Sequence, residues 1–433
     1  MVSIFWFRRD LRLDDNAALY HALKSSHPVV PIFIFDTNIL DDLEDKNDRR
    51  VDFIHQSLQL IQQQLLQLGS TLHIYVGTPE VCFENILNDY NVKAVYTNQD
   101  YEPYAKQRDS NIETLLSNNS IPFYLFKDQV LFEKNEIVKD DGKPYTIYTP
   151  YSKKHKSRLN EFYLKHYPTE KYYGNFYKQN AKYFPSIEDL GFNKTGYVFQ
   201  SPKPDINIIK NYNETRDYPA LNGTSKLSVH LRFGTVSIRK LATLAKELND
   251  VYLNELIWRD FYHMLIWQFP KTVNTSFHEE YDNIQWRNNE NEFKAWCEGQ
   301  TGYPIVDAGM RELAQTGHMH NRVRMVVASF LTKHLLIDWR WGEIWFSKKL
   351  MDYDMANNVG GWQWAAGCGC DAAPYFRIFN PYTQTEKYDD KHLYIKKWVP
   401  EYDSLKYVQP IIIHEVARVR CLKAYKEALA LKR

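Results

Sequence analysis

Short, almost wholly apolar runs alternate with helix-like stretches through the first third of the chain. The runs cover residues 2–7, 28–35, 71–76, 92–97 and 121–126. Strands that are apolar on both sides are typical of a parallel sheet covered by helices on both faces. We therefore predict an α/β domain over residues 1–130, a doubly wound parallel sheet, in which Gly69 ends one of the helices. No G-x-G-x-x-G sequence follows the first run, so the usual dinucleotide fingerprint is missing.

The pattern of apolar positions changes twice more along the chain. Residues 131–204 are rich in Tyr, Lys and Pro with little periodicity, which predicts an interdomain linker. Its basic run at 153–158 could contact nucleic acid, but such runs are more often solvated surface. From 205 to 433 the apolar residues recur at helical spacing, which predicts an all-α second domain.

The composition narrows the possible classes of protein. A chain of 433 residues exceeds the usual size of one core, which favours two domains. Aromatic residues make up 15% of the chain, so rings are expected to do more than pack. The net charge of +1 leaves nucleic-acid binding to a local surface. Five cysteines, an odd and sparse set, and no apolar run of about 20 residues predict a soluble, intracellular, cytoplasmic protein outside the membrane.

The stretch from residue 351 to 376 places acids, amides and tryptophans close together. Asp352 and Asp354 would diverge on a regular helix, which fits a helix end where one acid pairs an arginine and the other accepts from a ligand N–H. Asp354 could instead be a simple N-cap. Cys368 and Cys370 are too few for a structural zinc site, so we expect packing residues and no metal.

Two predicted helices carry polar groups on faces that also hold aromatic or apolar residues. Glu255, Trp258 and Tyr262 share one face by spacing, although Glu255 could simply point to solvent at a helix edge. Asn321 and Met325 share a face of a later helix in the same way.

Long segments of the chain resemble one family. Residues 5–16 (FWFRRDLRLDDN), 216–228, 254–265, 301–313, 318–342 and 353–381 are similar to the photolyase/cryptochrome family, most closely to class I cyclobutane pyrimidine dimer DNA photolyases. The resemblance implies an α/β antenna domain and a helical domain that holds a U-shaped FAD. It also implies a carbon–carbon lyase for light-driven DNA repair, in which reduced FAD donates an electron to a flipped dimer and splits it.

The resemblance also implies which residues hold the flavin. The expected contacts are Tyr212, Thr224, Ser225, Lys226, Leu227, Ser228, Tyr252, Arg324, Asp352, Tyr353, Asp354 and Asn358. Hydroxyls and backbone N–H groups at a helix start suit the phosphates of the cofactor. Asn358 would lie near the flavin N5, and Tyr252 stands where the family usually has tryptophan. Electrons would reach the flavin through Trp362, Trp339 and Trp286.

For damaged DNA, the resemblance implies a further set of contacts. The expected contacts are Arg216, Glu255, Trp258, Tyr262, Asn321, Arg322, Trp364 and Gln384. Trp258 and Trp364 would pack against the dimer, and Met325 would fill space beside it. Glu255, with Asn321, would bond the pyrimidine carbonyls and stabilise the charge that grows there. The catalytic set is then Glu255, Trp258, Asn321, Met325 and Asn358.

Two alternative functions stay open. A cryptochrome photosensor is disfavoured by Asn358, since sensors usually carry Asp or Cys there, and by the absence of a long tail after residues 415–433. A (6-4) photolyase would need histidines at Asn321 and Met325, and His320 should point about 100° away from that face.

An antenna chromophore near residues 98–109 could be a folate, a deazaflavin or absent. We expect a monomer that binds UV-damaged DNA.

Overall fold

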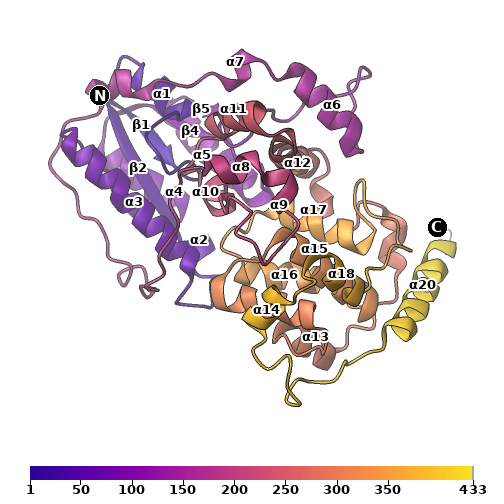
Figure 1. Ribbon diagram of the computed structural model, residues 1–433. Coiled ribbons are helices and arrows are strands. Elements are labelled where there is room, and N and C mark those ends of the chain that lie inside the picture. Colours follow the sequence, from indigo (N-terminus) through magenta and orange to yellow (C-terminus); the bar gives the residue numbers. More distant parts are fainter. Residues whose placement is uncertain (432–433) are drawn as a thin grey trace. The chain divides into compact units, whose positions relative to one another are not determined.

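The computed structural model describes residues 1–431 and divides them into two compact units (Figure 1). The first unit comprises residues 1–133, 157–204 and 226–247, and the second comprises the remaining described residues. Among the described residues, no helix is long and apolar enough to cross a membrane.

The first unit is built on a five-stranded parallel sheet. The strands are β1 (Val2–Phe7), β2 (Val29–Asp36), β3 (His73–Gly77), β4 (Val92–Asn98) and β5 (Phe123–Phe126). Their order in the sheet is β3-β2-β1-β4-β5. Each predicted apolar run therefore forms a strand, and the predicted parallel sheet is confirmed.

Helices cover both faces of this sheet because successive side chains of a strand point to opposite sides. Phe5 and Phe7 share a core with α1 (Ala17–Leu23) and α3 (Arg49–Gln67). Ile4 and Trp6 share another core with α4 (Pro79–Asp89) and α5 (Pro103–Asn118). Just after α3, Gly69 adopts the left-handed φ of 72° that its position as a stop residue predicted.

The remaining helices follow the division into units. Those with most residues in the first unit are α2 (Thr37–Leu40), α7 (Glu161–Leu164), η1 (Thr169–Asn175), α10 (Ser228–Phe233) and α11 (Ile238–Leu248). The earlier helices of the second unit are α6 (Tyr148–Arg158, whose last two residues belong to the first unit), α8 (Ile206–Lys210), α9 (Tyr212–Thr215), α12 (Asp250–Gln268), η2 (Pro270–Val273), η3 (Glu279–Asn283), α13 (Glu290–Cys297) and α14 (Pro304–Thr316). The later ones are α15 (Asn321–Ser329), the π-helical η4 (Phe330–His334), α16 (Trp339–Lys349), α17 (Met355–Ala366), α18 (Pro381–Tyr388), α19 (Leu393–Trp398) and α20 (His414–Ala430).

The units do not follow the domain boundaries that the sequence predicted. The expected linker contains helices and is shared between the units, with residues 134–156 in the second and 157–204 in the first. Residues 226–247, expected in the helical domain, belong to the first unit. The physical reason is that Phe233 packs into the core of the sheet, while Arg239 pairs with Asp15 at 3.0 Å.

Candidate active site

A cavity of about 370 Å³ opens in the second unit, where α17 packs against α12, α15 and α16. Many of the residues expected at the site line it together. They are Arg216, Glu255, Trp258, Tyr262, Asn321, Arg324, Met325, Asp352, Tyr353, Asp354, Asn358, Trp362 and Trp364. The cavity therefore gathers residues expected at the flavin and residues expected at the lesion.

One wall of the cavity is acidic and is held in place by basic partners. Arg324 donates to both carboxylate oxygens of Asp352, at 2.8 and 3.1 Å. Asp354 caps α17 by accepting from the backbone N–H of Asn357 at 3.2 Å, and its other oxygen lies 3.4 Å from Nε2 of His263. Asp354 is thus an N-cap whose side chain also lines the cavity, and its acceptance of a hydrogen bond from a ligand N–H stays a prediction.

Asn358 is oriented by a carboxyl group that sequence reasoning missed. Its side-chain amide donates to Oε1 of Glu343 at 2.9 Å and to the backbone carbonyl of Glu343 at 3.1 Å. The Tyr353 hydroxyl donates to the same Oε1 at 3.3 Å. Burial raises the pKa of Glu343, although both hydrogen bonds oppose this shift. The only signal in the sequence was an acid among the aromatic residues of 339–346.

Glu255 does not point freely to solvent, because it forms an ion pair with Arg216. Burial raises the pKa of Glu255, and the charge of Arg216 opposes this shift. Arg322 likewise pairs with Asp217 at 2.7 Å and lies over the Tyr388 ring. Both arginines expected at the DNA backbone are therefore held by carboxylates of this chain.

Two adjacent glycines of α17 have different surroundings. A Cβ at Gly360 would overlap the ring of Tyr262 on α12, so only glycine allows this close helix contact. A Cβ at Gly361 would meet no atom within 4 Å, and Gly361 lines the cavity. The first glycine serves helix packing, and the second leaves room in the cavity.

This contrast predicts opposite results for two alanine variants. Gly360→Ala should lower the free energy of unfolding by about 1 to 2 kcal/mol, because the overlap outweighs the helical preference of alanine. Gly361→Ala should leave the stability of the cofactor-free protein equal or slightly higher, while narrowing the cavity. Urea unfolding of both variants checks this, and equal destabilisation of both would contradict it.

His320 caps α15, and its environment keeps it uncharged. Its Nδ1 accepts from the backbone N–H of Arg322 at 3.1 Å, and its side chain does not line the cavity. Burial lowers the pKa of His320 to about 4. An acceptor Nδ1 must be unprotonated, so the cap itself requires the neutral imidazole.

The shifted pKa of His320 predicts a pH-dependent stability. Its pKa of about 4 in the folded state lies below the unfolded value of ~6.5, so between these values the unfolded chain binds more protons. Stability should therefore fall as the pH drops through this window. Between pH 7 and 4.5 the protein should lose about 2 kcal/mol more than a His320→Asn variant, whose side chain can also cap a helix. The free energy of unfolding of both proteins is measured by urea unfolding at a series of pH values. An equal loss in both proteins between pH 7 and 4.5 would contradict this prediction.

Several expected residues do not line the cavity. Ser225 bonds the hydroxyl of Tyr252 at 2.9 Å, and Tyr212 packs edge-on against the Tyr252 ring. The expected phosphate-binding run is split, since Thr224 and Ser225 lie in the second unit and residues 226–228 in the first. The others are Arg322, Trp286, which is half-buried, Trp339, which is fully buried, and Gln384, whose Oε1 is buried without a hydrogen-bond partner among the described residues.

Residues 98–109, expected near an antenna chromophore, carry ion pairs within the first unit. Asp100 accepts from Arg9 at 3.2 Å, and Asp109 pairs with Arg8 and Arg108. The charged groups of this segment are therefore largely neutralised by residues of the same unit.

The cysteines of the stretch serve packing and hydrogen bonding. The Cys368 thiol is buried and lies 3.8 Å from the carbonyl of Gln363, and the Cys370 thiol donates to the carbonyl of Thr146 at 2.8 Å. Burial raises the pKa of both thiols to about 12. Both side chains are thus held as neutral thiols.

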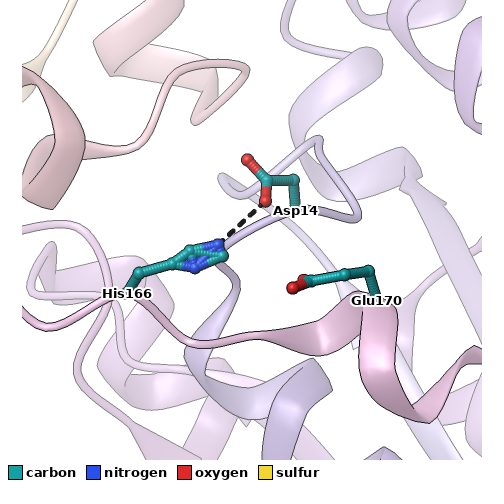
Figure 2. A group of neighbouring side chains, drawn as sticks. All are labelled: Asp14, His166 and Glu170. Carbon is teal, nitrogen blue, oxygen red and sulfur yellow. Dashed lines mark hydrogen bonds and ion pairs between the residues drawn. The ribbon is translucent and has the colours of Figure 1, made fainter.

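One group of potential metal ligands lies in the first unit, formed by Asp14, His166 and Glu170 (Figure 2). Asp14 already accepts from His166 at 3.1 Å and forms an ion pair with Lys240. The Lys240 ammonium therefore balances the Asp14 carboxylate within this exposed group.

Comparisons with known proteins show the family of the chain. Residues 252–418 match the FAD binding domain of DNA photolyase, and residues 3–171 match the DNA photolyase family. A protein of Alkalihalophilus pseudofirmus named deoxyribodipyrimidine photo-lyase is 37% identical, covering 95% of this chain and 89% of its own.

Two solved structures are also similar over nearly the whole chain. A bacterial class III photolyase from Agrobacterium tumefaciens has a TM-score of 0.87 and 32% identity, covering 99% of this chain and 97% of its own. An archaeal photolyase from Sulfolobus tokodaii, described as containing two FAD molecules with the implication of a novel light-harvesting cofactor, has a TM-score of 0.84 and 34% identity. That similarity covers 99% of this chain and 100% of its own.

Proposed function

Because the chain belongs to the DNA photolyase family, we propose that it repairs cyclobutane pyrimidine dimers in UV-damaged DNA. It is a FAD-dependent lyase for light-driven DNA repair, as the matching domains and the named relative indicate. The fold, family and cofactor expected from the sequence are confirmed. The observation that carries the proposal is one cavity lined both by Asp352, Asp354 and Asn358, which we call the acid–amide wall, and by the aromatic residues Trp258 and Trp364.

The residues of the acid–amide wall fit a flavin ring. Such a ring offers N–H and carbonyl groups along its edge and a broad flat face. Asp352 and Asp354 can accept hydrogen bonds, and Arg324 and Asn358 can donate them. When bound, reduced FAD supplies the electron that light makes available for transfer. The role of the residues in this wall is to bind the flavin ring. Glu343 keeps the Asn358 amide oriented toward that task by accepting its hydrogen bond.

The other residues of the cavity suit a flipped pyrimidine dimer. Trp258 and Trp364 offer ring surfaces on which bases can stack. Asn321 offers an amide beside them, and Met325 offers an apolar, adaptable side chain. Burial raises the pKa of Glu255, and its partner Arg216 also lines the cavity, so this pair can stabilise negative charge that develops on a carbonyl held there.

The choice of lesion rests on the histidine beside the cavity. Repair of a (6-4) photoproduct needs a proton donor near neutral pH. Asn321 and Met325 face the cavity, whereas His320 caps a helix and has a pKa of about 4. This arrangement supports the cyclobutane dimer as the lesion. Its splitting requires that the dimer accept one electron, that two carbon–carbon bonds break, and that the electron return to the flavin, with no proton donor.

The experiment is a repair assay under blue light with the purified, FAD-containing protein in its reduced form. We expect restoration of thymine dimers in an oligonucleotide and no repair of a (6-4) oligonucleotide. Efficient (6-4) repair would overturn the choice of lesion. Flavin binding without repair of either lesion would favour the photosensor alternative.

A further inference from the structure

Tyr148, the first residue of α6, makes a close contact with the principal aromatic residue of the cavity. Its ring stacks on that of Trp258 with a centroid distance of 3.6 Å and an interplanar angle of 4°. The cavity is lined by Trp258 and not by Tyr148. Tyr148 therefore covers one face of an indole that is itself exposed to the cavity.

Hydrogen bonds hold Tyr148 both at its ring hydroxyl and at its backbone. Its hydroxyl donates to the backbone carbonyl of Asn254, one turn before Trp258 on α12, at 2.9 Å. Its backbone N–H donates to the Asp371 carboxylate at 3.0 Å, and nearby Thr146 accepts from the Cys370 thiol. The residues that follow the acid–amide wall along the chain thus anchor the segment that carries Tyr148.

We propose that Tyr148 is a positioning residue for the lesion, holding the Trp258 indole in the plane against which a flipped base stacks. The inference rests on the proposed function and extends it to a residue outside the cavity. Without the stack, the half-buried Trp258 side chain would lose conformational entropy when a base binds. Because the stack already fixes its rotamer, that loss no longer opposes binding. Tyr262 also packs against this indole, at a centroid distance of 5.6 Å and an interplanar angle of 28°, so Tyr148 is the neighbour whose ring lies nearly parallel to it.

The test compares variants of the full-length, FAD-loaded protein by dissociation constants measured in the dark. The probes are a thymine-dimer oligonucleotide and the same oligonucleotide undamaged. Tyr148→Leu removes the ring, and Tyr148→Met is a second variant that fills the same space. Tyr148→Phe keeps the ring and loses only the bond to Asn254. Tyr145→Leu, on the same segment, is the matched control, since Tyr145 has its ring contact with Tyr151.

We expect Tyr148→Leu and Tyr148→Met to weaken dimer binding roughly 3- to 10-fold, as the loss of an aromatic pair implies. Binding of undamaged DNA should not change. Tyr148→Phe, which keeps the ring and loses one anchor, should weaken dimer binding less than Tyr148→Leu, and the control should bind the dimer as the unmodified protein does. In a Trp258→Leu background, Tyr148→Leu should have no further effect, because the two residues act through one stack.

Unchanged dimer binding in Tyr148→Leu, equal weakening for both oligonucleotides, or a full effect in the Trp258→Leu background would overturn the proposal. Loss of folding in both the leucine and the methionine variants would also overturn it, since Tyr148 would then hold the fold and not the indole. If the unmodified protein does not prefer the dimer, the proposed function fails. If it does and Tyr148→Leu is silent, only this inference fails.

Discussion

Trp362→Phe should slow the light-driven reduction of bound, oxidised FAD on the order of a hundredfold, as a barrier higher by roughly 3 kcal/mol implies. Trp362 lines the cavity and is otherwise buried, and phenylalanine gives up an electron far less readily than an indole. Flavin absorbance under blue light with an external reductant measures the rate. Repair by chemically reduced enzyme should persist, because that reaction needs no electron from Trp362.

The matched control for this variant is Trp398→Phe. Trp398 packs against the same hydrophobic core but does not line the cavity. It should photoreduce at the rate of the unmodified protein. If Trp362→Phe also does so, then electrons reach the flavin by another route, and the proposed chain through Trp339 and Trp286 fails.

Trp258→Ala should weaken binding of a thymine-dimer oligonucleotide by about 1 to 3 kcal/mol, the usual contribution of one aromatic residue stacked on a base. This corresponds to roughly a 5- to 150-fold higher dissociation constant. The expectation follows from the position of Trp258 in the cavity wall, where its ring is only half-buried. Fluorescence anisotropy with labelled oligonucleotides in the dark provides the measurement.

Trp267→Ala is the control on the same helix. Trp267 belongs to α12, lies outside the cavity lining and has the Lys134 ammonium 5.0 Å from its ring centroid. Its loss should leave dimer affinity unchanged. An unchanged dissociation constant for Trp258→Ala would remove stacking from the account of lesion recognition.

Local features of the sequence predicted much of the fold. The five strands were predictable because almost wholly apolar runs that alternate with helical stretches are typical of a buried parallel sheet. The N-cap role of Asp354 was also among the alternatives, since aspartate before a helix is a common cap. These features depend on neighbours close in the chain.

The missed features depend on contacts between distant segments. Glu343 reaches Asn358 across two helices, and Tyr148 reaches Trp258 from a segment that looked irregular. Helical spacing likewise could not show that Phe233 belongs to the sheet core, because periodicity gives a buried face and not its partner. The family resemblance identified residues at the cavity, but not the residues that hold them.

The interleaved division of the chain has a consequence for protein synthesis. Domains generally fold as units while the chain is being made, with the N-terminal part first. Here the sheet core includes Phe233, and the buried carboxylate of Asp15 pairs with Arg239 and accepts from the Ser237 hydroxyl. The first unit therefore stays incomplete on the ribosome until more than half of the chain has been translated. A nascent chain stalled at residue 204 would expose apolar surface that a chaperone must cover.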